Sequence, residues 1–182
     1  MGTSRAQRIG IWIIAIVMFV GSIGAYFLVI IANENRNKAA QELQQEQKRS
    51  AERQKKSPEA LPGYKAEKFV AKDVKKLEKT DLKQGSGKEV AAESNLEVNY
   101  FGWTPDGKIF DSTNRGGAVE PVSFSLYGVI EGWSEGLVGA KEGGVRKLVI
   151  PAKQAYGERG SGTSIPPNTP LTFIVEIKKV SS

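Results

Sequence analysis

The chain has 182 residues and contains no histidine and no cysteine. Their absence excludes histidine-assisted general-base catalysis, thiol chemistry, disulfides and most zinc or copper sites, so we expect no metal centre. The net charge of +6 arises in the N-terminal part, because residues 84–182 hold ten basic and eleven acidic side chains, and we expect no nucleic-acid binding there.

Residues 1–8 form a short basic tail, and residues 9–32 form an apolar run without any ionisable side chain. As a helix this run would span roughly 36 Å, more than the ~30 Å hydrocarbon core of a bilayer. The alternative is a cleaved signal peptide, whose apolar core is only about 7–15 residues long. Ile30-Ile-Ala32 is a poor cleavage site, so we predict an uncleaved single-pass anchor that contacts the lipid bilayer through residues 9–32.

The orientation of this anchor is predicted from the basic residues around it. Arg5 and Arg8 favour an N-terminus inside the cell, although Arg36 and Lys38 closely follow the apolar run. We expect the N-terminus inside and the remainder of the chain outside the cytoplasm.

Residues 33–60 are predicted to form a charged helical linker. They are rich in Glu, Gln, Lys, Arg and Ala, with no glycine or proline before Pro58. Leu43 is the only large aliphatic side chain before that proline, so a coiled-coil seam is absent. We interpret the segment as a solvated spacer, with a basic face lying on anionic lipid as the alternative.

Residues 61–182 have glycine-rich turns between short apolar runs, as expected of one compact domain. Apolar and polar residues alternate in a way that predicts half-buried strands, and one short helix is predicted from apolar positions at helical spacing over 130–137. Strands are predicted at 96–100, 108–111, 146–150 and 171–177. The predicted fold class is α+β, with a curved antiparallel β-sheet wrapped over the short helix.

Two glycine clusters fail as nucleotide-binding motifs. Gly85-Ser-Gly-Lys88 is followed by Glu89 where a phosphate loop requires Ser or Thr. The glycines of 157–162 do not open a helix after a strand, as a dinucleotide fingerprint requires. We interpret both clusters as turns and expect no nucleotide cofactor.

Seven motifs occur in order between residues 82 and 180. They are Val98-Asn-Tyr-Phe-Gly102, Asp106-Gly-Lys-Ile-Phe-Asp-Ser112, Val129-Ile-Glu-Gly-Trp-Ser-Glu-Gly-Leu137, Leu148-Val-Ile-Pro151, Ala155-Tyr-Gly157, Ile165-Pro-Pro-Asn168 and Leu171-Thr-Phe173. In this order and spacing the region resembles the FKBP-type peptidyl-prolyl cis-trans isomerases. The resemblance implies an FKBP-like fold and a rotamase that acts on Xaa-Pro segments of folding proteins without covalent catalysis or a cofactor.

The resemblance also implies an apolar aromatic pocket. It places Trp133 at the floor, and assigns the backbone N–H of Ile130 and the hydroxyl of Tyr156 to hold substrate carbonyls. The further residues expected to line its walls are Tyr100, Phe110, Val122, Val129, Ile165 and Phe173. From periodicity alone, a plain hydrophobic core is the favoured interpretation of Trp133 and Phe173, and only the joint pattern of motifs favours the pocket.

Asp111 matches a pocket carboxylate that the family holds with a tyrosine and an arginine. Tyr100 and Arg115 are the candidates in this chain. Val122 stands where many members have phenylalanine, so we expect a wider pocket that binds macrolide inhibitors weakly.

Two other functions remain open at the level of the sequence. One is a tethered module, or chaperone, that binds proline-containing segments with little catalytic activity. The other is a structural tether whose basic helix organises lipid or a complex. The joint presence of Tyr100, Asp111, Trp133 and Tyr156 favours the enzyme.

Overall fold

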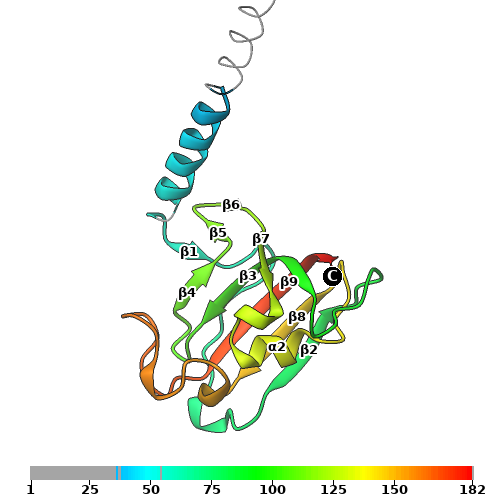
Figure 1. Cartoon of the computed structure of the whole chain (residues 1–182). Coiled ribbons are helices and arrows are strands. Elements are labelled where there is room, and N and C mark those ends of the chain that lie inside the picture. Colours follow the sequence, from blue (N-terminus) through cyan, green and yellow to red (C-terminus); the bar gives the residue numbers. More distant parts are fainter. Residues whose placement is uncertain (1–35, 37, 54, 182) are drawn as a thin grey trace, which may run out of the picture. The chain divides into compact units, whose positions relative to one another are not determined.

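The computed structural model describes residues 36, 38–53 and 55–181 (Figure 1). The predicted membrane anchor, residues 9–32, lies outside this set. Within the described ranges, none of the helices combines the length and the apolar character needed to cross a bilayer. The chain divides into two units, Met1–Glu52 and Arg53–Ser182.

Residues 38–53 are helical, and the side chains of 38–52 are exposed. These residues fall within the predicted linker, residues 33–60. The second unit begins at Arg53 and therefore includes residues 53–60, which the sequence analysis assigns to the linker.

The second unit is built on an antiparallel sheet with the strand order β2-β8-β9-β3-β4. Its strands are β2 Glu78–Lys83, β3 Asn95–Trp103, β4 Ile109–Ser112, β7 Val122–Ser125, β8 Val145–Ile150 and β9 Leu171–Ser181. β9 pairs with β3 along its length, whereas β4 and β7 pair with opposite ends of the other edge of β3. The four predicted strands are thereby confirmed.

A smaller sheet of three very short strands has the order β1-β5-β6. They are β1 Pro58–Glu59, β5 Asn114–Arg115 and β6 Ala118–Val119. None of them was predicted from the sequence, because two residues are too few to show an alternating pattern.

The predicted helix is α2, Glu131–Leu137, and it lies across one face of the main sheet (Figure 1). A helix of seven residues is not stable alone, so packing must hold it. Gly132 and Gly136 permit a close approach: an added Cβ would lie 2.3 Å from Ile150 Cγ2 and 2.8 Å from Leu148 Cδ2, respectively. The short 3₁₀ helices are η1 Ala71–Asp73, η2 Leu126–Gly128, η3 Ala152–Gln154 and η4 Gly157–Arg159.

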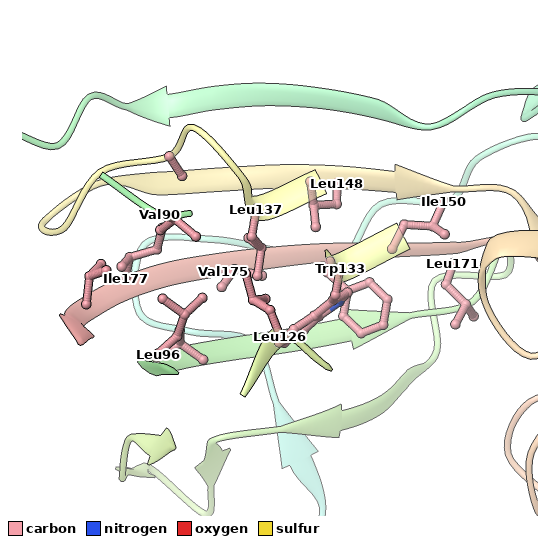
Figure 2. Close-up of a cluster of buried hydrophobic side chains, with 14 of the residues drawn as sticks. Val90, Leu96, Leu126, Trp133, Leu137, Leu148, Ile150, Leu171, Val175 and Ile177 are labelled. Carbon is pink, nitrogen blue, oxygen red and sulfur yellow. The ribbon is translucent and has the colours of Figure 1, made fainter. Parts of the chain in front are cut away.

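The main sheet has a hydrophobic core on each of its two faces. The first core lies between the sheet and α2, and includes Leu96, Trp133, Leu148 and Val175 (Figure 2). The second includes Phe101, Trp103, Val145 and Ile174, covered by Leu61 and neighbouring residues of 60–69. The half-buried pattern predicted for 96–100 and 171–177 therefore describes only part of β3 and β9, because the segment before β2 buries the opposite face.

Candidate active site

A cavity of about 420 Å³ opens beside the N-terminal end of α2. Its walls come from β3, β4, β7, β9 and the turn that precedes the helix. The lining residues are Tyr100, Phe110, Asp111, Val122, Phe124, Gly128, Val129, Ile130, Trp133, Tyr156 and Phe173.

Aromatic rings in edge-on contacts form the floor and the walls. The Trp133 ring lies 5.1 Å from Tyr100 and 5.2 Å from Phe173, with interplanar angles of 90° and 84°. Phe173 in turn meets Phe110 at 5.6 Å and 88°, and Phe124 is tilted against Trp133 at 5.1 Å. Such edge-to-face pairs are a favourable arrangement of aromatic rings. The Nε1 atom of Trp133 is buried and has no hydrogen-bond partner in the described part of the chain.

Asp111 is held from two sides at the edge of this cavity. The hydroxyl of Tyr100 donates to Oδ2 of Asp111, and Nη2 of Arg115 donates to Oδ1 at 2.6 Å. The backbone N–H of Ser112 also donates to Oδ1, at 2.9 Å. Burial and the Asp111 carboxylate raise the pKa of Tyr100 far above its ordinary value, so this phenol stays protonated and keeps donating.

Two groups at the cavity can donate hydrogen bonds to a ligand. Ile130 precedes α2 in an extended conformation, and among the described residues its N–H takes part in no hydrogen bond. The Tyr156 hydroxyl likewise has no partner within the described ranges. Burial, with a smaller effect of Asp111, raises the pKa of Tyr156, so its O–H persists as a donor at neutral pH.

Nine of the eleven predicted site residues line the cavity. Arg115 contacts Asp111 without lining the cavity, and Ile165 is buried in the core cluster that contains Trp133. Phe124 and Gly128 line the cavity although the sequence analysis did not single them out. Phe124 could have been found from its spacing, because residues 122 and 124 of one strand point to the same face.

The chemistry available to this site is binding and orientation. Among the residues that the structure describes, no group of three Asp or Glu side chains is arranged to hold a metal ion. Asp111, which supplies a carboxylate to the cavity, accepts hydrogen bonds from Tyr100 and Arg115. The site therefore offers an apolar surface, the Asp111 carboxylate, and two hydrogen-bond donors that have no partner among the described residues, the Ile130 N–H and the Tyr156 hydroxyl.

Two solved structures have a similar architecture. A peptidyl-prolyl cis-trans isomerase from Pseudomonas syringae pv. tomato is 42% identical with a TM-score of 0.53, over 58% of this chain and 76% of that one. AtFKBP13 is 34% identical with a TM-score of 0.52, over 58% of this chain and 93% of that one. The protein therefore has an FKBP-like fold, with an antiparallel sheet and a short helix.

Similar proteins of known family extend the assignment from the fold to the protein family. An FK506-binding protein of Neisseria meningitidis serogroup A is 44% identical over 100 residues, which are 55% of this chain and 92% of the relative. FkpA of Escherichia coli K12, an FKBP-type peptidyl-prolyl cis-trans isomerase, is 40% identical over 134 residues, which are 74% of this chain and 48% of FkpA. The family model for FKBP-type peptidyl-prolyl cis-trans isomerases matches residues 86–178. The chain belongs to this family and is a peptidyl-prolyl cis-trans isomerase.

Proposed function

We propose that the aromatic cavity is the site of isomerisation and that it works by binding the twisted form of an Xaa-Pro amide. The observation that carries the proposal is the pairing of an apolar aromatic floor with two donors, the Ile130 N–H and the Tyr156 hydroxyl, which have no partner among the residues that the structure describes. The expected substrates are proline-containing segments of folding proteins.

The physical problem is the barrier to rotation about the C–N bond, about 18–20 kcal/mol for a peptide bond. A planar amide is more charge-separated than a twisted one, so water stabilises the planar form more. An apolar cavity removes this solvation and favours the twisted form, which is differential binding of the transition state. Lowering the barrier by ~5 kcal/mol accelerates rotation by about 10³–10⁴.

The polar residues orient the substrate for this step. The Ile130 N–H and the Tyr156 hydroxyl hold carbonyls on either side of the rotating bond, while the proline ring lies over Trp133. Asp111 accepts hydrogen bonds from Tyr100 and Arg115, and these bonds keep the Tyr100 side of the cavity in place. None of these side chains forms or breaks a covalent bond.

Macrolide binding is proposed to be weak. The Neisseria meningitidis relative is named an FK506-binding protein. In this chain Val122 contributes a small and 40% exposed wall, which gives a macrolide less apolar surface to cover.

To test the site, exchange between the cis and trans forms of a short Xaa-Pro peptide is measured by NMR with the full chain in detergent micelles. We expect acceleration by the native protein and a clear reduction in Tyr156→Phe and in Asp111→Ala. Equal acceleration by all three proteins would show that isomerisation occurs elsewhere. Peptide binding without acceleration by any of them would indicate a proline-binding module.

We also propose a single-pass membrane anchor at residues 9–32, with the isomerase domain outside the cytoplasm and the charged helix at 38–53 as a spacer. The support is the length and apolar character of 9–32. Because the chain has no cysteine, single reporters can be introduced as Ser86→Cys in the domain and Ser4→Cys in the tail. In intact spheroplasts a membrane-impermeant maleimide is expected to label only the domain reporter, and the reverse pattern would overturn the orientation.

A further inference from the structure

Arg53 is an arginine outside the family-matched region that is built into the isomerase domain. It is the last helical residue of 38–53, yet its side chain is only 18% exposed. Nη2 donates to the Thr113 carbonyl at 2.6 Å and to the Ala118 carbonyl at 3.2 Å, and Nη1 pairs with Glu120. One guanidinium therefore binds both ends of the β5–β6 hairpin.

This hairpin carries Arg115, the residue that holds Asp111. Its two strands have two residues each and are joined by Gly116 and Gly117, both with positive φ. Such a short hairpin has little stability of its own. It depends on the segment before it, because β5 pairs with β1 and Nη1 of Arg115 donates to the Lys56 carbonyl at 3.3 Å.

Thr113, which accepts a hydrogen bond from Arg53, also pairs with Tyr100, the second side chain that holds Asp111. The Thr113 N–H donates to the Tyr100 carbonyl at 2.9 Å, and the Tyr100 N–H donates to the Thr113 hydroxyl at 2.9 Å. Arg53 thus binds a residue that is paired directly with Tyr100.

We infer that Arg53 is a positioning residue for isomerisation, which fixes the hairpin so that Arg115 and Tyr100 hold Asp111 in place. The inference rests on the proposed role of Asp111 in the cavity. It predicts that the end of the helical segment takes part in activity through these contacts, although it lies before the family-matched domain. Hydrogen bonds from a charged donor in a partly buried setting are strong enough for such a role.

The test compares Arg53→Ala with Arg49→Ala in the full chain in detergent micelles. Arg49 lies one helical turn earlier and is exposed, so its replacement removes the same charge without touching the hairpin. We expect Arg53→Ala to lower kcat/KM by about threefold to tenfold, and Arg49→Ala to leave it unchanged. If Arg53→Ala does not fold, as judged by thermal unfolding, Arg53→Gln keeps one donor for the Thr113 carbonyl and is expected to show a smaller loss.

A double-mutant cycle separates positioning from a general loss of stability. In an Arg115→Ala background, Arg53→Ala is expected to lower kcat/KM by less than about twofold, because the contact of Arg115 with Asp111, one of the two through which Arg53 acts, is already gone. The same loss in both backgrounds would overturn the inference, as would native kcat/KM in Arg53→Ala alone. If Asp111→Ala itself leaves isomerisation intact, the proposed function fails. If Asp111→Ala is impaired and Arg53→Ala is native, only the role of Arg53 fails.

Discussion

At the scale of single residues, Tyr156 gives the most direct test of substrate orientation. Its hydroxyl has no partner within the described residues, so Tyr156→Phe breaks no hydrogen bond that the structure shows. We expect kcat/KM to fall about fivefold, the value of one hydrogen bond, while the free energy of unfolding changes by less than about 0.5 kcal/mol. NMR exchange and chemical denaturation measure the two quantities. Tyr64→Phe, in the core on the other face of the sheet, is the matched control, and a similar loss of kcat/KM in it would contradict the assignment.

The pH dependence of activity also follows from individual residues. The chain has no histidine, and the pKa values of Tyr100 and Tyr156 are both raised from an ordinary value of 10.0. A raised pKa keeps each phenol protonated across the neutral range, so both donors persist there. We expect kcat/KM to be flat between about pH 6 and pH 9. A pH–rate profile with an inflection near pH 7 would show that another titrating group is essential.

At the scale of elements, the packing of α2 against β8 determines where Trp133 lies. Gly132→Ala and Gly136→Ala raise helix propensity by roughly 0.5–1 kcal/mol. In the protein we expect the opposite sign, a loss of about 1–3 kcal/mol of unfolding free energy, because the added methyl groups overlap Ile150 and Leu148. Chemical denaturation measures the change. Glu135→Ala, on the exposed side of the same helix, is the control, and stabilisation by either glycine variant would contradict the packing.

The C-terminal end of α2 is joined to the sheet through Arg146. Its Nη1 donates to the Gly136 and Val138 carbonyls at 3.0 Å each, and its Nε and Nη2 donate to Asp81 at 2.6 and 3.0 Å. The hydrogen bonds from Arg146 lower the pKa of Asp81 below its ordinary value of 3.8. Ionised Asp81 therefore stabilises the fold above its unfolded pKa, and this contribution disappears as the pH falls through the folded pKa.

We accordingly expect the native protein to lose more unfolding free energy between pH 6 and pH 3 than Asp81→Asn does. Urea denaturation at a series of pH values measures both slopes. Asp73→Asn, an exposed carboxylate in η1, is the control and is expected to keep the native slope. Parallel curves for the native protein and Asp81→Asn would refute the role of this ion pair.

Much of the fold and of the site could be predicted because their residues carry local signals. Alternation identified the strands at 96–100 and 171–177, and turn residues and Pro151 marked those at 108–111 and 146–150. Motif residues such as Trp133 and Tyr156 lie within or just beside regular elements. The β1, β5 and β6 strands were missed because strands of two residues leave no periodic pattern, and because β1 pairs with a strand more than 50 positions further along the chain. Arg53 was missed for a different reason. From the sequence, a charged residue at the end of a charged helix cannot be told from any other solvated side chain.

At the scale of the whole molecule, the second core makes the domain larger than its family-matched region. Residues 60–69 cover Phe101, Trp103 and Ile174, which lie on the sheet face away from α2. We expect a fragment of residues 75–182 to expose this face, bind a hydrophobic dye and unfold at a lower temperature than residues 53–182. Thermal unfolding of both fragments makes the comparison. Equal stability would mean that the covering segment contributes no net free energy.

The central position of β9 affects how the protein folds during its synthesis. β9 lies between β8 and β3, and its end at Ser181 pairs with Asn95, 86 residues earlier in the chain. Synthesis proceeds from the N-terminus, so β3 and β8 cannot pair with β9, which lies between them, until β9 has been synthesised. Phe173, a wall of the cavity, arrives with the same strand. We therefore expect the sheet and the catalytic pocket to form together, after β9 has been synthesised, through long-range and slow pairing.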